Sequence, residues 1–134
     1  MVSVGYPHDG YICLWDWRSG KLLTKVKACS SCSAISSVNF SSDAKCVLTA
    51  GEKHLKFWKI GSSIRPRTNT RVGSLVMHGK PVNLGHKKGY SFIAIVSPNR
   101  TDSSLVGCDQ AGQTSPIYAL TDAGRFTLIL ISYF

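Results

Sequence analysis

The chain has 134 residues, of which 43% are hydrophobic and 17% are charged, and its mean hydropathy is +0.02. This composition can build a core and argues against disorder along the whole chain. No charged start followed by an apolar run is present, and no apolar run reaches the roughly 18 residues of a membrane span, so we expect a cytoplasmic protein without membrane contact.

The chain is basic, with 16 Lys and Arg against 7 Asp and Glu and a net charge of +9. Such a charge suits RNA or another polyanion. The basic residues are scattered, however, so a nucleic-acid partner is only the alternative interpretation. Its centre would be a set of five residues, namely Lys53, Lys56, Arg65, Arg67 and Arg71.

Short alternating apolar runs separated by turns rich in Gly, Pro, Asp and Ser predict antiparallel strands along the whole chain. No stretch has a sustained apolar period of 3.6, so we expect no helix. The predicted strands fall into three units, at about 1–28, about 33–78 with an exposed basic loop at 61–73, and about 89–134 with an insertion at 97–115.

A degraded repeat joins the first two units. The segment DGYICLWD at 9–16 returns as EKHLKFWK at 52–59, and Trp15 and Trp58 stand 43 residues apart. This spacing lies within the period of about 40–45 residues that is typical of β-propeller blades. The chain would then hold about three blades, whereas about 4–8 close a ring, and blades need neighbours to bury their faces. We therefore expect part of a larger propeller, whose missing blades lie elsewhere in a parent chain.

The segment VNFSSDAK at 38–45 resembles the first-strand motif of WD repeats and its Asp-containing turn. In that family, Asp, Ser or Thr, and Trp join a histidine in a buried hydrogen-bond network. The connection at 27–33 has no histidine, Glu52 replaces the turn aspartate, and Lys59 follows Trp58 where Asp is usual. The positions that match the WD motif are Ser3, Asp9, Trp15, Asp16, Asp43, Thr49, Trp58 and Asp122. The resemblance implies an all-β partial WD-repeat β-propeller of about two and a half to three four-stranded antiparallel blades.

The segments at 8–17, 53–58 and 117–124 resemble the mitogen-activated protein kinase-binding protein 1 group, which includes WD repeat-containing protein 62, and plant members in particular. For animal members, this implies large scaffolds that bind stress-kinase components and act in signalling or at spindle poles of the cytoskeleton. Those docking regions lie mostly outside such blades. Residues 125–134 no longer follow the resemblance, which favours a truncated or mis-joined gene product.

Catalytic and metal-binding motifs do not emerge. The four histidines share no metal-ligand spacing, the Cys-x-x-Cys at 29–32 has no second pair, and there is no nucleophile elbow or phosphate-binding loop. We expect no enzyme, no metal and no cofactor. Trp15 and Trp58 are expected between blades, and Trp17, which has no counterpart in the second unit, is the candidate for a surface contact together with the basic residues above.

Three hypotheses for the function follow. The first is a non-enzymatic fragment of a protein–protein interaction scaffold. The second is the basic surface that binds RNA or another polyanion. The third is a truncated product without independent function, whose apolar end at 128–134 would favour aggregation.

Overall fold

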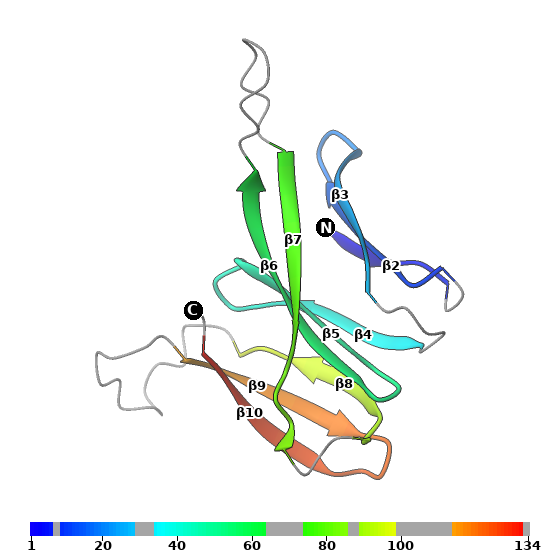
Figure 1. Ribbon diagram of the computed structural model, residues 1–134, viewed down its shortest axis with the longest axis vertical. Helices are drawn as coiled ribbons and strands as arrows, with labels where there is room; N and C mark the ends of the chain where they lie inside the picture. Colours follow the sequence, from blue (N-terminus) through cyan, green and yellow to red (C-terminus); the bar gives the residue numbers. More distant parts are fainter. Residues whose placement is uncertain (7–8, 29–33, 64–73, 86–88, 99–113, 133–134) are drawn as a thin grey trace.

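A computed structural model describes residues 1–6, 9–28, 34–63, 74–85, 89–98 and 114–132. The described residues form three antiparallel sheets and no helix, in agreement with the predicted all-β class (Figure 1). The first sheet contains β1 (Val2–Val4), β2 (Tyr11–Asp16) and β3 (Lys21–Lys27). The second contains β4 (Ile35–Phe40), β5 (Cys46–Gly51), β6 (His54–Ser63) and β7 (Ser74–Pro81). The third contains β8 (Phe92–Val96), β9 (Thr114–Thr121) and β10 (Phe126–Ser132).

The sheets stack face to face, with the four-stranded sheet in the middle (Figure 1). One core lies between the first and second sheets and is formed by Ile12, Leu14, Ala28, Val47, Trp58 and Met77. The other lies between the second and third sheets and is formed by Leu48, Ala50, Leu55, Phe92, Ile95, Ile117, Ala119 and Ile129. Because successive strand residues point to opposite faces, β5 supplies side chains to both cores and is buried along its whole length.

Strands β4 and β8 lie next to each other but are joined by side chains rather than by a sheet ladder. Ser36 Oγ donates to the Phe92 carbonyl oxygen at 2.5 Å, and Ser37 Oγ accepts from the Ile95 N–H at 3.2 Å. These short polar side chains satisfy the backbone groups that an edge strand leaves unpaired. The second and third sheets are thereby fixed against each other along one edge.

The second unit differs from the prediction at β6 and β7. Residues 61–63, predicted to begin the basic loop, continue β6, and β7 runs past the predicted end of the unit at about 78 as far as Pro81. The reason is the long β6–β7 pairing, in which Gly79 lies opposite Trp58. The indole ring covers the space beside Gly79 that a side chain would fill, so a glycine that suggested a turn is accommodated in a strand.

The third unit differs at its insertion. Strand β9 begins at Thr114, within the predicted insertion of 97–115, because β10 is long enough to pair with it from Phe126 to Ser132. Residues 99–113 lie outside the described part of the chain. The three described sheets form an open stack that does not close on itself (Figure 1).

Candidate interaction surface

A buried hydrogen-bonded chain links β5 and β6 on the face turned toward the first sheet. Trp58 Nε1 donates to Thr49 Oγ1 at 2.9 Å, and Thr49 Oγ1 lies 2.8 Å from His54 Nε2. All three side chains are buried. Thr49 Oγ1 accepts from the indole, and its own proton is available to the imidazole in the tautomer whose Nε2 carries the lone pair. The chain therefore satisfies polar groups whose burial would otherwise be costly.

His54 is suited to the acceptor role. Burial, reinforced by the positive charge of Lys56, lowers the pKa of His54 to about 4. The imidazole is therefore neutral at pH 7, and one of its two ring nitrogens can accept a hydrogen bond.

The first sheet has a smaller version of this arrangement. Trp15 Nε1 donates to Ser3 Oγ at 2.8 Å, and both residues are half-buried on the outward face of the sheet. Asp9 contributes its backbone N–H to the Tyr6 carbonyl at 2.9 Å. In the described part of this sheet, no side-chain bond ties Asp9 to Trp15 or Ser3.

Asp16 stabilises the turn after β2. Its carboxylate accepts from the Ser19 hydroxyl at 2.8 Å and from the Arg18 N–H at 3.0 Å. These two bonds lower the pKa of Asp16, because they favour the charged carboxylate. The residue thus caps a turn and does not extend toward Trp15.

Asp43 and Asp122 are also turn residues. Burial tends to raise the pKa of Asp43, but bonds from the Ser41 hydroxyl at 2.6 Å and the Lys45 N–H at 3.1 Å outweigh it, and the pKa is lowered. Asp122 is exposed and donates its backbone N–H to the Ser91 carbonyl. The motif aspartates therefore act in local turns.

The structure separates the residues predicted to form one interaction surface. Trp17 is 69% exposed, lies in the turn after β2, and has the Arg18 guanidinium 5.2 Å from its ring centroid. Lys53 is exposed in the two-residue turn between β5 and β6, with a φ of 48°. The turn after β2 lies at the same end of the stack as the ends of β6 and β7 that flank residues 64–73, whereas the β5–β6 turn lies at the opposite end (Figure 1).

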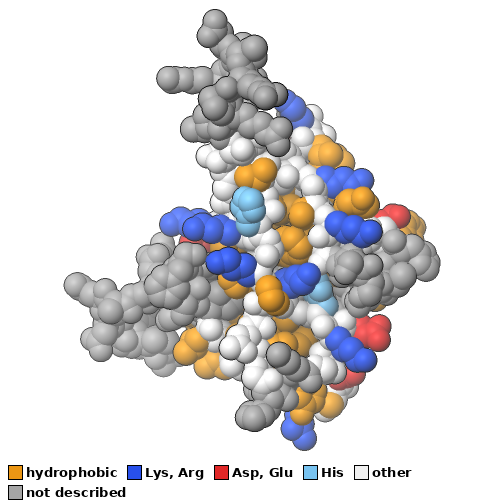
Figure 2. All heavy atoms as spheres, viewed as in Figure 1, with side chains coloured by type: hydrophobic (Ala, Val, Ile, Leu, Met, Phe, Trp, Pro, Cys, Tyr) orange, Lys and Arg blue, Asp and Glu red, His pale blue; other side chains and the backbone are white. Residues whose placement is uncertain are grey.

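We call these two ends the Trp17 rim and the Lys53 rim. Arg65, Arg67 and Arg71 lie outside the described residues. Lys56 belongs to neither rim, because its Nζ donates to the Ala28 carbonyl at 2.8 Å and lies 5.7 Å from the Trp58 ring centroid. The Lys56 ammonium therefore makes its contacts between the first and second sheets and not at either rim. On the face shown in Figure 2, lysines and arginines are spread among apolar and uncharged polar side chains and do not form one patch.

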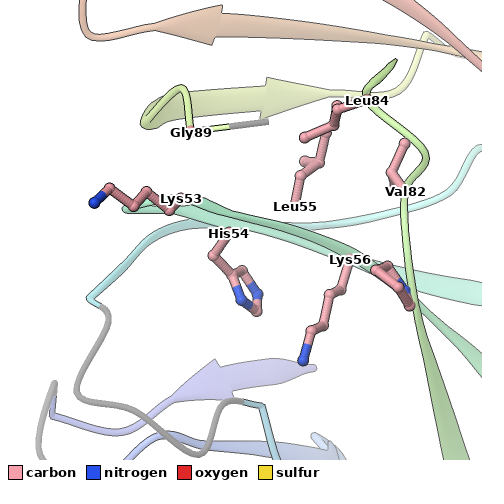
Figure 3. A pocket seen from close by; sticks show the side chains of 8 residues that line it. Lys53, His54, Leu55, Lys56, Val82, Leu84 and Gly89 are labelled. Carbon is pink, nitrogen blue, oxygen red and sulfur yellow. The ribbon is translucent and has the colours of Figure 1, made fainter. Parts of the chain in front are cut away.

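A shallow hollow of about 220 Å³ lies along β6 near the Lys53 rim. His54 and Lys56 point to one side of β6, and Leu55 points to the other side, toward Leu84 (Figure 3). This alternation leaves no convergent set of polar groups of the kind that orients a small molecule. The hollow is lined by Lys53, His54, Leu55, Lys56, Pro81, Val82, Leu84 and Gly89.

The described residues also offer little redox or metal chemistry. They contain no group of three or more His, Cys, Asp or Glu side chains able to hold a metal ion. Cys13 and Cys46 are free thiols, and burial, with the nearby charge of Asp43, raises the pKa of Cys46, which makes it a poor nucleophile. The part of the chain that the structure describes has no helix long and apolar enough to cross a bilayer.

Sequence reasoning missed the role of His54. The WD pattern directs attention to a histidine before a blade, in the connection at 27–33, whereas His54 follows a turn inside the sheet. Its signal in the sequence was its position at the start of β6, four residues before Trp58 on the same face of an alternating strand. No protein-family model matches the chain, and no solved structure gives a significant match.

Proposed function

We propose that this chain is part of a WD-repeat β-propeller that acts as a non-enzymatic scaffold for other proteins. The observation that carries the proposal is the buried Trp58–Thr49–His54 chain, together with its smaller equivalent at Trp15 and Ser3. Tryptophan, hydroxyl and histidine are three of the residue types that WD repeats use to tie strands together.

The stacking of the sheets supports the same proposal. Three antiparallel sheets follow one another in chain order. Strand β3 of the first sheet contacts β7 of the second, and β4 of the second sheet contacts β8 of the third. A propeller repeats this arrangement around an axis. The repeated sheets then provide a rigid frame, and the turns at its two rims provide variable contacts.

The Trp17 rim is the stronger candidate for a protein contact. An exposed tryptophan with an arginine beside its ring combines two of the residue types that dominate binding energy at protein interfaces. By resemblance, the parent protein would act in kinase signalling or at the mitotic spindle. The partners would then be proteins of those assemblies.

The proposal can be tested by site-specific photo-crosslinking. A photoreactive phenylalanine analogue is placed at position 17 or, in a second protein, at position 53, and each protein is exposed to cell extract. Proteins crosslinked from position 17 are then purified and titrated against the unmodified chain. We expect Trp17→Ala to weaken binding on the order of tenfold or more, because truncation of an interface tryptophan costs about 2 kcal/mol or more.

His78→Ala provides a control, because His78 is exposed in the middle of β7, opposite Lys59, and lies between the two rims. It should leave the affinity unchanged. Crosslinked proteins that do not bind the unmodified chain once purified, or binding that Trp17→Ala leaves intact, would count against a scaffold role for this rim.

A further inference from the structure

The second half of β7 is an exposed edge of the middle sheet. Strand β7 is the last in the order β4-β5-β6-β7, and the chain leaves it for β8 of the third sheet (Figure 1). Its first half packs beside β3 of the first sheet, and Met77 is buried there. All residues from His78 to Pro81 are exposed. This edge is therefore set by the strand order within the middle of the chain.

The alternation of hydrogen bonds shows which backbone groups of β7 point outward. The Val82 N–H donates to the Leu55 carbonyl at 3.1 Å, and the β6–β7 pairing continues from there without a register shift. In an antiparallel ladder every second residue faces the same neighbour, so Gly79 and Pro81 face away from β6. The Gly79 N–H and the carbonyls of Gly79 and Pro81 have no other partner among the described residues.

Basic side chains flank this edge on one face of the sheet. His78 and Lys80 are two residues apart and therefore share a face of β7, and Lys59 lies opposite His78 on β6. All three side chains are exposed, and neither lysine forms an ion pair within the described part of the chain. On the other face, the indole ring of Trp58 fills the space beside Gly79. A strand added to this edge would thus lie beside unpaired positive charge on one face.

We propose that the exposed end of β7 binds an extended acidic segment of another protein by strand addition. In this mode, backbone hydrogen bonds supply affinity and side chains at alternate positions supply specificity. An antiparallel segment can exchange hydrogen bonds with Gly79 through its central residue and can donate to the Pro81 carbonyl two residues earlier. The residues on either side of the central one then lie beside His78 and Lys80, where cross-strand pairing favours acidic side chains.

The same features disfavour a second copy of this edge as the partner. Two β7 edges would bring the basic side chains of both copies together, and like charges on neighbouring strands destabilise their pairing. Pro81 has no N–H to donate, and lysine and proline are residues that protect sheet edges from self-association. Because the chain has a net charge of +9, an acidic partner is also attracted at long range.

Titration of a short peptide into the full chain, followed by NMR, tests strand addition. The probe is acetyl-Thr-Glu-Val-Glu-Thr-amide. The Gly79 amide resonance should shift downfield when its N–H gains an acceptor, whereas the Gly61 amide should not move, because Gly61 is already paired with Val76. Methylation of the central valine nitrogen should weaken binding on the order of tenfold, because it removes the N–H that bonds the Gly79 carbonyl. Methylation of the first glutamate nitrogen, which faces away from β7, should change the affinity little.

A charge exchange tests the acidic preference and the register together. Lys80→Glu should weaken binding of the probe by about five- to tenfold at low salt. The peptide acetyl-Thr-Lys-Val-Glu-Thr-amide places its lysine opposite position 80 and should bind Lys80→Glu more tightly than it binds the unmodified chain. Lys45→Glu is the matched control, because Lys45 is exposed in the turn between β4 and β5, and it should bind the probe like the unmodified chain.

Other outcomes would overturn the proposal. These are a Gly79 amide that does not shift, equal losses from the two methylated peptides, or an unmodified chain that prefers the lysine peptide. Self-association that shifts the Gly79 amide without peptide would identify a second copy as the partner instead. Circular dichroism melts verify folding, and if Lys80→Glu fails to fold, His78→Glu replaces it with lysine at the second acidic position of the peptide. Strand addition does not involve Trp17, so the crosslinking result stands or falls separately.

Discussion

At the scale of single residues, the most consequential feature is the buried chain that joins Trp58, Thr49 and His54. Its two hydrogen bonds measure 2.9 and 2.8 Å. In the first sheet, the Trp15–Ser3 bond is only half-buried and remains accessible to water. Because a lost hydrogen bond costs more where water cannot replace the missing partner, the two tryptophans should differ in their contribution to stability.

This difference is measurable by urea denaturation. Trp58→Phe removes the indole N–H and leaves a gap, and should lower the free energy of unfolding by about 2–4 kcal/mol. Trp15→Phe should lower it by about 1 kcal/mol or less. Equal losses for the two variants would contradict the structural difference between the sites.

His54 should make stability depend on pH. Its pKa is about 4 in the folded protein, against an ordinary value of 6.5, so between these two pH values the unfolded chain binds a proton that the folded chain does not. Stability should therefore fall as the pH decreases from 6.5 to 4, by roughly 3 kcal/mol in total, and this contribution is constant above pH 6.5.

Thermal melts of the unmodified chain and of His54→Gln between pH 7.5 and 4 test this expectation. The variant should show a smaller decrease over this range, because glutamine does not titrate. The lowered pKa values of Asp16 and Asp43 affect both proteins alike at more acidic pH and cancel in the comparison. Parallel curves for the two proteins would exclude His54 as the source of the slope.

At the scale of elements, the β6–β7 hairpin shows how a tertiary contact replaces a local preference. Gly79 and Pro81 are residue types that favour turns, and both lie beyond the predicted end of the second unit at about 78. The residues nevertheless lie in β7, with Gly79 opposite Trp58 and Pro81 at the end of the strand. The indole ring of Trp58 occupies the space that a side chain at position 79 would need, so only glycine is accommodated there.

A pair of glycine variants tests this fit. A Cβ added at Gly79 would lie 2.4 Å from Cζ3 of Trp58, whereas one added at Gly61 meets nothing within 4 Å. Gly79→Ala should therefore destabilise the protein by about 1–3 kcal/mol through overpacking. Gly61→Ala should be neutral or slightly stabilising in the same denaturation experiment. A neutral Gly79→Ala would show that the ring is not fixed in this position.

At the scale of the whole molecule, the net charge of +9 is distributed rather than concentrated. The five residues of the polyanion hypothesis do not form one described site. The Lys56 ammonium is bonded to the Ala28 carbonyl, and Lys53 is exposed at the Lys53 rim. Any affinity for RNA should then reflect overall charge and weaken steeply with salt.

The Lys56→Gln variant distinguishes a structural role of Lys56 from a role in binding RNA. The Lys56 ammonium bonds the Ala28 carbonyl, so the variant should lose about 1–2 kcal/mol of stability and leave the affinity for an RNA oligonucleotide nearly unchanged. Lys53→Gln is the matched control, because it removes the same charge from an exposed turn. An RNA affinity that is insensitive to salt, or one lost specifically in Lys56→Gln, would contradict this assignment.

The sequence by itself determined the β class, most strand positions and the relation between Trp15 and Trp58. These are local properties, because alternation and turn residues act between neighbours along the chain. The tertiary structure decided the partner of Thr49, the continuation of β7 past Gly79, and the separation of Trp17 from Lys53. Each of these depends on which strand and which sheet face lies opposite a residue. Two faces with the same alternating pattern differ only in whether another sheet covers them, and that is decided by contacts between residues distant in sequence.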